Sequence, residues 1–256
     1  MNIFSWNGQK FVQVPGSLEQ IAVGDFEGRA VWGVNANSDV FKFNPTSGAF
    51  EQVTGKLVSI SAAGPSVAGN PPSVWGINAN SDIFTFNSTT GAFEPVPGKL
   101  TSISVGEEVW GINANSDIFR LNPTSALFEQ VPGKLVSISS GFGQVWGINA
   151  NSDVFKFNPT SVVFEQVPGK LVSITGGGWG LNNANDIFLF DGQQFNQFPG
   201  KLNSIVSFGE STVWGINPSL EVFTFDATTD PPSFQQRPGL LRQIAVDEQG
   251  FAWGLH

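Results

Sequence analysis

A five-residue polar segment, Asn-Ala-Asn-Ser-Asp, occurs four times in this sequence, and a Gly-Lys pair follows each copy. Amide, carboxylate and ammonium groups together supply the paired donors and acceptors that bind a sugar hydroxyl. We expect each segment and its lysine to line a cleft between neighbouring structural units and bind one monosaccharide, with Trp or Phe as an apolar wall. The candidate ligand-binding residues are Asn35, Asn37, Asp39 and Lys56; Asn78, Asn80, Asp82 and Lys99; Asn113, Asn115, Asp117 and Lys134; and Asn149, Asn151, Asp153 and Lys170.

Two other interpretations of the polar segment remain open. Asn, Asp and Ser in a hairpin commonly bond their own backbone, and that alone explains the motif. Asn-x-Asn-x-Asp also places oxygen ligands at alternate positions, as the start of a calcium loop does, but the Gly and the bidentate Glu of such a loop are missing. We therefore expect no metal ion and no cofactor.

The residues that catalysis needs are scarce. The chain has no Cys, and its only His is His256, so no central Ser-His-Asp or Cys-His arrangement is available. It also lacks a Gly-Lys-Ser/Thr phosphate loop. A catalytic site that occurs once in the chain should contain residues that the repeat does not share. The sequence shows no such unique pair of carboxylates. These features predict a binding protein and not an enzyme.

The charge balance limits the partners. Twelve basic and 21 acidic side chains give a net charge of −9, which argues against nucleic acid and anionic membranes because phosphate binding needs a positive surface. The N-terminal sequence resembles no signal peptide, and no run of about 18 apolar residues predicts membrane insertion. Without cysteine or a signal peptide, we expect a cytoplasmic protein, or one exported by a route that leaves no mark in the sequence. A homo-oligomer is compatible with the sequence, which assigns no apolar patch for association.

The polar segments belong to a longer repeat that must position them. A Trp-Gly pair recurs at intervals of 33 to 43 residues, at Trp32, Trp75, Trp110, Trp146, Trp179, Trp214 and Trp253. Within one unit we predict four β-strands, each rich in β-branched or aromatic residues and bounded by turn residues. In the fourth unit these are residues 135–139, 145–149, 154–158 and 164–167, and Pro168-Gly169 ends the last of them.

Four antiparallel strands per unit of about 36 residues are typical of a β-propeller blade. We predict an all-β, seven-bladed propeller of four-stranded antiparallel blades that occupies residues 1–256 as a single domain. The chain starts with a third and a fourth strand (2–5, 11–14) and finishes with a first and a second strand (241–246, 251–255). These fragments sum to one blade, so the two ends share a sheet that closes the ring. The motif decays at residues 182–186 and 217–221.

Which loops share a face follows from the strand order. In such a blade the chain runs out and back twice. The hairpin after the second strand and the crossover after the fourth therefore lie on one face of the ring. Asn-Ala-Asn-Ser-Asp and Pro-Gly-Lys should lie there together. The tryptophans and the repeated phenylalanines are expected to be packing residues, because the Trp sit in mid-strand beside a Gly that permits close approach.

Three motifs make the chain resemble the tectonin family of β-propeller repeats. They are Val-Trp-Gly-Ile/Val-Asn in the second strand, Asp-Ile/Val-Phe opening the third, and Phe-Glx-x-Val-Pro-Gly-x-Leu bridging to the next blade. The resemblance implies a lectin of innate defence, similar to members that bind microbial surface glycans. It further implies, from the fungal members, cytosolic recognition of O-methylated fucose or mannose. Many members have six repeats, whereas this chain has seven. The alternative is a propeller that acts as a protein-interaction scaffold without glycan affinity.

Overall fold

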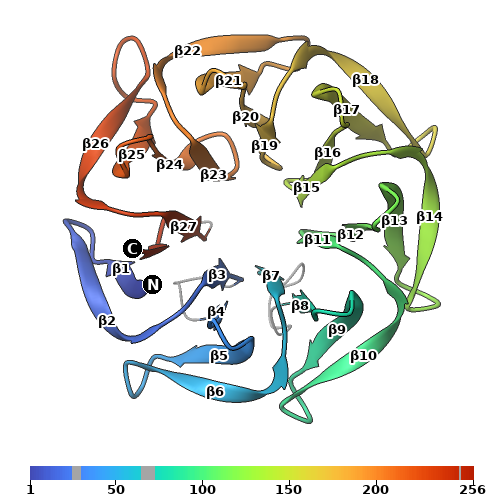
Figure 1. The fold of residues 1–256 in the computed structure, drawn as a ribbon. Helices are drawn as coiled ribbons and strands as arrows, with labels where there is room; N and C mark the ends of the chain where they lie inside the picture. The colour runs from blue at the N-terminus through green and yellow to red at the C-terminus, as the bar shows by residue number, and fades with distance from the viewer. Residues whose placement is uncertain (25–29, 65–72, 248) are drawn as a thin grey trace.

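The computed structural model describes residues 1–24, 30–64, 73–247 and 249–256. They form 28 strands arranged as seven four-stranded antiparallel sheets around a common axis (Figure 1). The prediction of an all-β, seven-bladed propeller is confirmed. Among the described residues, no helix is long and apolar enough to cross a membrane.

Each blade runs from its innermost first strand to its outermost fourth strand (Figure 1). Blade 1 consists of β3 (Gln20–Val23), β4 (Val31–Val34), β5 (Asp39–Asn44) and β6 (Ala49–Lys56). Blade 2 consists of β7 (Ser59–Ala63), β8 (Ser73–Ile77), β9 (Asp82–Asn87) and β10 (Ala92–Lys99). Blade 3 consists of β11 (Ser102–Val105), β12 (Val109–Ile112), β13 (Asp117–Asn122) and β14 (Leu127–Lys134). Blade 4 consists of β15 (Ser137–Gly141), β16 (Gln144–Ile148), β17 (Asp153–Asn158) and β18 (Val163–Lys170).

The remaining blades follow the same order. Blade 5 consists of β19 (Ser173–Ile174), β20 (Trp179–Leu181), β21 (Asp186–Phe190) and β22 (Phe195–Lys201). Blade 6 consists of β23 (Ser204–Phe208), β24 (Thr212–Ile216), β25 (Glu221–Asp226) and β26 (Ser233–Leu240). Blade 7 consists of β27 (Gln243–Val246), β28 (Ala252–Leu255), β1 (Asn2–Trp6) and β2 (Phe11–Ser17).

Blade 7 joins the two ends of the chain, as the phase of the repeat predicted. β1 pairs antiparallel with β28, with Ile3 opposite Leu255 and Ser5 opposite Trp253. The apolar side chains of this blade pack into clusters shared with blade 1 on one side and blade 6 on the other. Closure therefore removes from water the two sheet faces that an open array would expose.

The four predicted strands of blade 4 form with shifted ends. The first begins at Ser137 and not at Leu135, because the Leu135 amide donates to a carbonyl of blade 3 at 3.0 Å and belongs to the crossover. The second and third differ from the prediction by single residues at their ends. The fourth continues through Pro168 and Gly169, so the prediction that this pair ends the strand is wrong. Proline is tolerated because β18 is an outer edge strand, where a missing amide hydrogen removes no ladder bond.

The tryptophans of the Trp-Gly pairs pack between blades. Their exposed fractions are at most 6%. Each contacts a Phe on the fourth strand of the next blade, with ring centroids 5.6 to 5.8 Å apart: Trp32–Phe93, Trp75–Phe128, Trp110–Phe164, Trp146–Phe195, Trp179–Phe234, Trp214–Phe11 and Trp253–Phe50. The prediction that these aromatic residues are packing residues is confirmed, and they form the interface between blades.

The glycine that follows each tryptophan lets a buried leucine of the same blade lie against the sheet. A Cβ atom added at Gly147 would lie 2.2 Å from Cδ1 of Leu135, whose side chain is 1% exposed. The six equivalent glycines show the same approach at 2.3 to 2.4 Å, at Gly33, Gly76, Gly111, Gly180, Gly215 and Gly254. Alanine at this position would therefore overlap an atom of the core.

The hairpins between third and fourth strands offer a test of backbone strain. Val162 lies at the tip of the blade 4 hairpin with φ of 57°, where Gly91 of blade 2 has φ of 69°. A β-branched residue is strained in this left-handed region, and glycine is not. We expect Val162→Gly to raise the free energy of unfolding by about 1 kcal/mol. Denaturant unfolding followed by circular dichroism measures this change.

The reverse substitution is the control. No heavy atom lies within 4 Å of a Cβ added at Gly91, so Gly91→Val tests the backbone alone. It should lower the free energy of unfolding by a similar amount, about 1 kcal/mol. Equal stability of both variants and the parent chain would contradict the strain.

Candidate binding site

The two faces of the ring differ in their loops. The hairpins between second and third strands and the crossovers between blades lie at one end of the ring. There the Leu135 amide donates to Ser116 O at 3.0 Å, and an equivalent bond recurs in each of the other six blades. We call this the crossover face. The other end, called the far face, carries the hairpins between first and second and between third and fourth strands. The prediction that the polar segment and the Gly-Lys corner share one face agrees with this arrangement.

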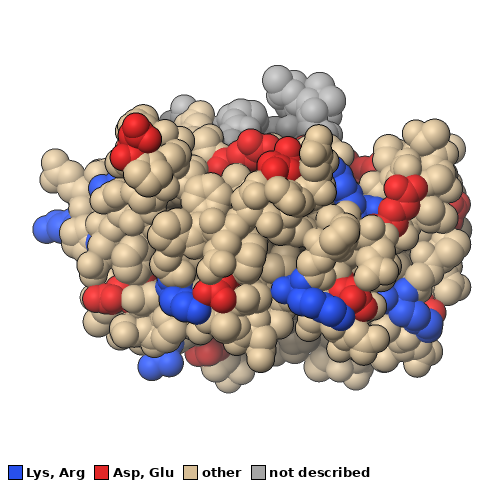
Figure 2. Space-filling view, turned by 90° about the horizontal axis from the view of Figure 1, so that it is seen from above, with Lys and Arg blue, Asp and Glu red and all other residues tan. Residues whose placement is uncertain are grey.

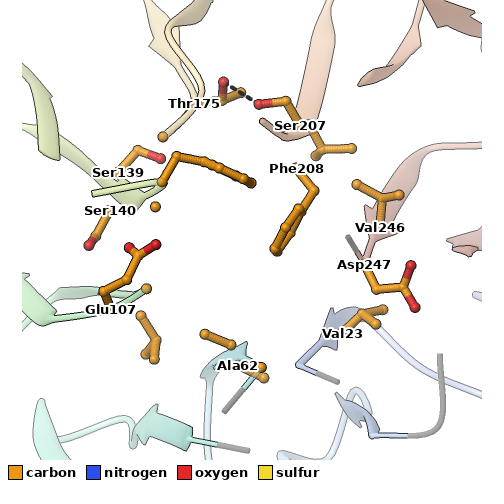
Figure 3. A pocket seen from close by; sticks show the side chains of 18 of the residues that line it. Val23, Ala62, Glu107, Ser139, Ser140, Thr175, Ser207, Phe208, Val246 and Asp247 are labelled. Carbon is orange, nitrogen blue, oxygen red and sulfur yellow. Dashed lines mark hydrogen bonds between the residues drawn. The ribbon is translucent and has the colours of Figure 1, made fainter. Parts of the chain in front are cut away.

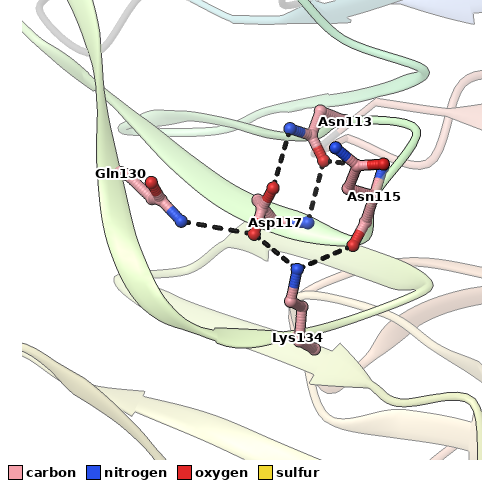
Figure 4. A network of polar contacts seen from close by, with 5 residues as sticks. All are labelled: Asn113, Asn115, Asp117, Gln130 and Lys134. Atoms are coloured by element: carbon pink, nitrogen blue, oxygen red, sulfur yellow. Dashed lines mark hydrogen bonds and ion pairs between the residues drawn. The ribbon is translucent and has the colours of Figure 1, made fainter.

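The polar hairpin of blade 3 is closed by its own side chains (Figure 4). Asn113 Oδ1 accepts hydrogen bonds from the amides of Asn115 and Asp117, each at 2.9 Å. Asn113 Nδ2 donates to Asp117 Oδ2 at 3.0 Å. Ser116 has φ of 62°, and its amide donates to Asn113 O at 3.0 Å. The structural interpretation of the motif therefore applies, because these side chains do bond their own backbone.

Lys134 comes from the outer strand and completes the network (Figure 4). A register shift in the β13–β14 pair places Lys134 opposite Asp117. Its Nζ donates to Asp117 Oδ1 at 2.6 Å and to the carbonyl oxygen of Asn115 at 2.9 Å. Gln130 Nε2 also donates to Asp117 Oδ1, at 3.2 Å. The bulge that lets the strand continue through Pro-Gly is thus what brings the lysine to the hairpin.

All four predicted sets form this network. The separations between lysine Nζ and aspartate Oδ1 are 2.7 Å for Lys56–Asp39, 2.5 Å for Lys99–Asp82, and 2.6 Å for Lys134–Asp117 and Lys170–Asp153. Figure 2 views the ring from its edge and shows basic and acidic side chains beside one another along one margin. Each set lies within a single blade, and the next blade begins directly after the lysine. The set therefore supplies one side of the junction between blades and not both.

Each network leaves polar groups free for a ligand. The lysine ammonium carries three protons and uses two of them. Among the described residues, the side-chain amides of the middle asparagines Asn37, Asn80, Asn115 and Asn151 make no hydrogen bond. Asp82 is 40% exposed, against 19 to 20% for its three counterparts, and Pro95 stands where the others have a glutamine. The blade 2 carboxylate is thus the most open of the four.

The aromatic wall expected beside each set cannot come from tryptophan, because the Trp-Gly tryptophans are buried between blades. Half-buried phenylalanines of the next blade are better placed. A Cβ added at Gly55 would lie 3.6 Å from Phe93 Cδ2, and one at Gly169 would lie 3.1 Å from Phe195 Cδ2. In blades 1 and 4 the Gly-Lys corner therefore lies close to an aromatic ring of the next blade, whereas a Cβ added at Gly98 or Gly133 of blades 2 and 3 would meet an isoleucine of its own blade.

The carboxylates of these networks are held in their charged form. The hydrogen bond from Lys134 is the largest influence that lowers the pKa of Asp117, and the bond from Asn113 acts in the same direction. The equivalent lysine and asparagine of each blade lower the pKa of Asp39, Asp82 and Asp153 in the same way. Among the described residues, no group of three His, Cys, Asp or Glu side chains could hold a metal ion.

A titration tests this network. The Asp117 pKa lies below its ordinary value, so the stability that the network adds is present above that value and is lost as the pH falls through the lowered pKa. We expect Lys134→Met to raise the Asp117 pKa, because it removes the largest influence. Carbon-detected NMR of the side-chain carboxyl measures both pKa values. An unchanged Asp117 midpoint in Lys134→Met would contradict the ion pair.

Two further hairpins keep the network in part, and the sequence motif did not identify them as sets. In blade 5, Lys201 bonds to Asp186 and donates to the carbonyl oxygen of Ala184 at 2.9 Å. The sequence could have indicated this partial network through Asn182 and Lys201, because both residues keep their places in the repeat. In blade 6, Asn217 Nδ2 donates to Glu221 Oε2 at 2.6 Å, but Leu240 replaces the lysine. Blade 5 thus has the ion pair but has Ala184 in the place of the middle asparagine, and blade 6 has neither the lysine nor that asparagine.

One family model matches along the whole chain. The Tectonin domain model matches residues 1–70, 65–178 and 175–256. No curated protein sequence matches the chain.

Several solved structures have a fold similar to that of this chain. Prp20p from Saccharomyces cerevisiae superposes with a TM-score of 0.76 at 8% identity, over 99% of this chain and 91% of that one. Human WBSCR16 gives 0.75 at 8% identity, over 99% and 98%. YCF48 from Cyanidioschyzon merolae gives 0.65 at 10% identity, over 100% and 99%. At such identities the likeness shows the fold alone.

Proposed function

Because the chain belongs to the Tectonin domain family, we propose that it is a multivalent carbohydrate-binding protein without catalytic turnover. Each intact polar set on the crossover face binds one monosaccharide. The observation that carries this proposal is the same network of Asn, Asp and Lys in four consecutive blades, with a free ammonium proton and a free amide in each. Weak single sites gain strength when several engage one glycan-coated surface.

The chemistry of the set suits a sugar ring. The lysine proton and the asparagine amide can donate to hydroxyl oxygens, and the amide oxygen can accept from a hydroxyl. Beside the sets of blades 1 and 4, the half-buried Phe93 and Phe195 of the next blade offer an apolar surface for a ring face or a methyl group. Following what the resemblance to fungal tectonins implies, we propose O-methylated fucose or mannose on microbial or invertebrate surfaces as the ligand, bound in innate defence.

A glycan array and a stoichiometry measurement test the proposal. We expect binding to methylated fucose or mannose glycans, and titration calorimetry should give four sugars per chain, one for each intact set. The double variant Asp117→Ala with Lys134→Ala should bind three, because it removes one set. Lys134 is exposed and Asp117 lies at the surface, partly buried, so the ring should stay folded without this pair.

A pair on the far face of the same blade is the matched control. Asn122 Nδ2 donates to Glu129 Oε1 at 2.7 Å, and Asn122→Ala with Glu129→Ala should keep four sugars per chain. Unchanged stoichiometry and affinity in the Asp117 and Lys134 double variant would reject this site. No binding to any methylated, fucosylated or mannosylated glycan would reject the lectin and leave the protein-interaction scaffold.

A further inference from the structure

A second concave site lies on the axis of the ring, at the far face. A cavity of about 460 Å³ is lined by the ends of the first strands of all seven blades. Its volume falls within the range of small-molecule pockets. The polar sets described above lie at the opposite end of the blades, so a ligand here would be independent of the sugar sites.

Blade 5 is built so that two aromatic residues can meet across it. Its first two strands are the shortest in the described chain, and Gly176 and Gly177 replace strand residues. A Cβ added at Gly177 would lie 2.3 Å from Gly209 O of blade 6, and one at Gly176 would lie 2.8 Å from Gly141 Cα of blade 4. Only glycine at these two positions of blade 5 lets the neighbouring segments of blades 4 and 6 lie this close to it.

Phe142 of blade 4 and Phe208 of blade 6 meet over this gap. Their rings are 4.4 Å apart between centroids and nearly perpendicular, at 84°. Both residues line the cavity, and Figure 3 shows the Phe208 ring directed into it. Neither residue belongs to the repeat, so the pair occurs once per ring.

Phe142 holds an unfavourable backbone conformation. Its φ is 58°, it is 37% exposed, and with Gly143 at φ of 64° it forms a two-residue hairpin turn. Asn-Gly is the preferred sequence for such a turn, because asparagine tolerates the left-handed region. An exposed aromatic residue that is strained and leans over a cavity is an outlier of the kind that clusters at ligand sites.

The charge of the cavity wall selects the ligand. The described lining residues include the carboxylates Glu107 and Asp247 but no Lys, Arg or His. Asp247 Oδ1 already accepts the amides of Gln249 and Phe251, whereas Glu107 is exposed and lies across the cavity from Phe208 (Figure 3). Aromatic rings attract cations through their faces, and a carboxylate adds a charge partner.

We propose that this cavity binds one small organic cation per ring, an amine or quaternary ammonium with an apolar body. The apolar part lies against Phe142 and Phe208, and the cationic group faces Glu107. The hydroxyl groups of Ser139 and Ser140 supply further acceptors at the wall. The site is separate from the sugar sites and does not depend on them.

Fluorine NMR with two matched probes tests the proposal. The cation 4-fluorophenethylamine should bind one per chain with a Kd of about 1 mM or lower. The anion 4-fluorophenylacetate, of similar size, should bind at least about tenfold more weakly because it faces a carboxylate. Equal binding of the two probes, or no binding of the cation at about ten times that concentration, would overturn the proposal.

Three variants locate the binding. Phe142→Asn should weaken the cation about tenfold while the protein stays folded, because asparagine suits the turn and offsets the lost ring contact with Phe208. Glu107→Gln should also weaken it about tenfold and leave the anion less disfavoured. Val162→Gly, at another strained position of the same blade outside the cavity, should leave the Kd unchanged. A Kd within about twofold of the parent in both Phe142→Asn and Glu107→Gln would place the cation elsewhere and refute the site.

Discussion

Replacing Trp146 with alanine should lower the free energy of unfolding by about 4 kcal/mol. Trp146 is 0% exposed and packs between blades 4 and 5, against Phe190 at 4.9 Å and Phe195 at 5.8 Å between ring centroids. The Lys156 ammonium also lies 5.1 Å from its ring. Alanine removes these contacts and leaves a cavity that the two rigid sheets cannot close.

The size of this loss is large beside the 5 to 15 kcal/mol that typically holds a folded protein together. Guanidinium unfolding followed by far-ultraviolet circular dichroism measures it. Trp6→Ala is the control, because Trp6 lies on a third strand and is only half-buried, so its loss should be smaller. If Trp146→Ala cost less than Trp6→Ala, the tryptophan would not be the main contact between blades.

Replacing Gly147 with alanine should cost about 2 kcal/mol, although it adds a single methyl group. The new Cβ would lie 2.2 Å from Leu135 Cδ1, and its three nearest atoms all belong to the Leu135 side chain. Leu135 is buried, so it must leave its preferred rotamer or push the strand outward. The expected effect is overpacking and not backbone strain.

A double-mutant cycle separates these two causes. Leu135→Ala alone removes core contacts and should cost about 3 kcal/mol. With Gly147→Ala added, the methyl group fills part of the space left by the leucine, so the combined loss should be smaller than the sum. Strictly additive losses would contradict overpacking. Unfolding free energies of the four proteins give the coupling.

The repeat made the architecture predictable from sequence. Seven Trp-Gly pairs and the offset of the ends determined the number of blades and the closing sheet, because these depend on periodicity and not on the detail of any strand. The fourth strands were predicted too short because Pro168-Gly169 looked like a terminator. That rule describes central strands, and an outer edge strand tolerates both residues as a bulge.

The residues of the candidate site were predictable from the sequence, but their contacts with one another were not. The sequence named the residues of each set because the repeat keeps them, and it placed them on one face because strand order decides it. It did not show that Lys134 and Asp117 are cross-strand neighbours in one sheet, because that depends on the register shift at the bulge. The partial set of blade 5 was missed because the motif was read as a whole segment, whereas Asn182, Asp186 and Lys201 alone make the contacts.

The cavity on the axis was not predicted at all. Its distinctive residues, Phe142 and Phe208, occur once and come from blades 4 and 6. A repeat describes contacts between neighbouring blades, and this pair reaches across a whole blade. The departures from the repeat were nevertheless visible, in Phe142-Gly143 and in the three glycines before Trp179.

The closing sheet also governs the order in which the protein can fold as it is made. Strands of blades 1 to 6 pair with strands close to them in the chain, so each blade can form soon after its own residues leave the ribosome. β1 and β2 are made first but must wait as an isolated hairpin, which is marginal in water, until β28 follows. Until then the waiting hairpin can pair with β28 of another copy. Crowded synthesis should therefore favour strand-exchanged dimers, in which each ring is completed by its partner's hairpin.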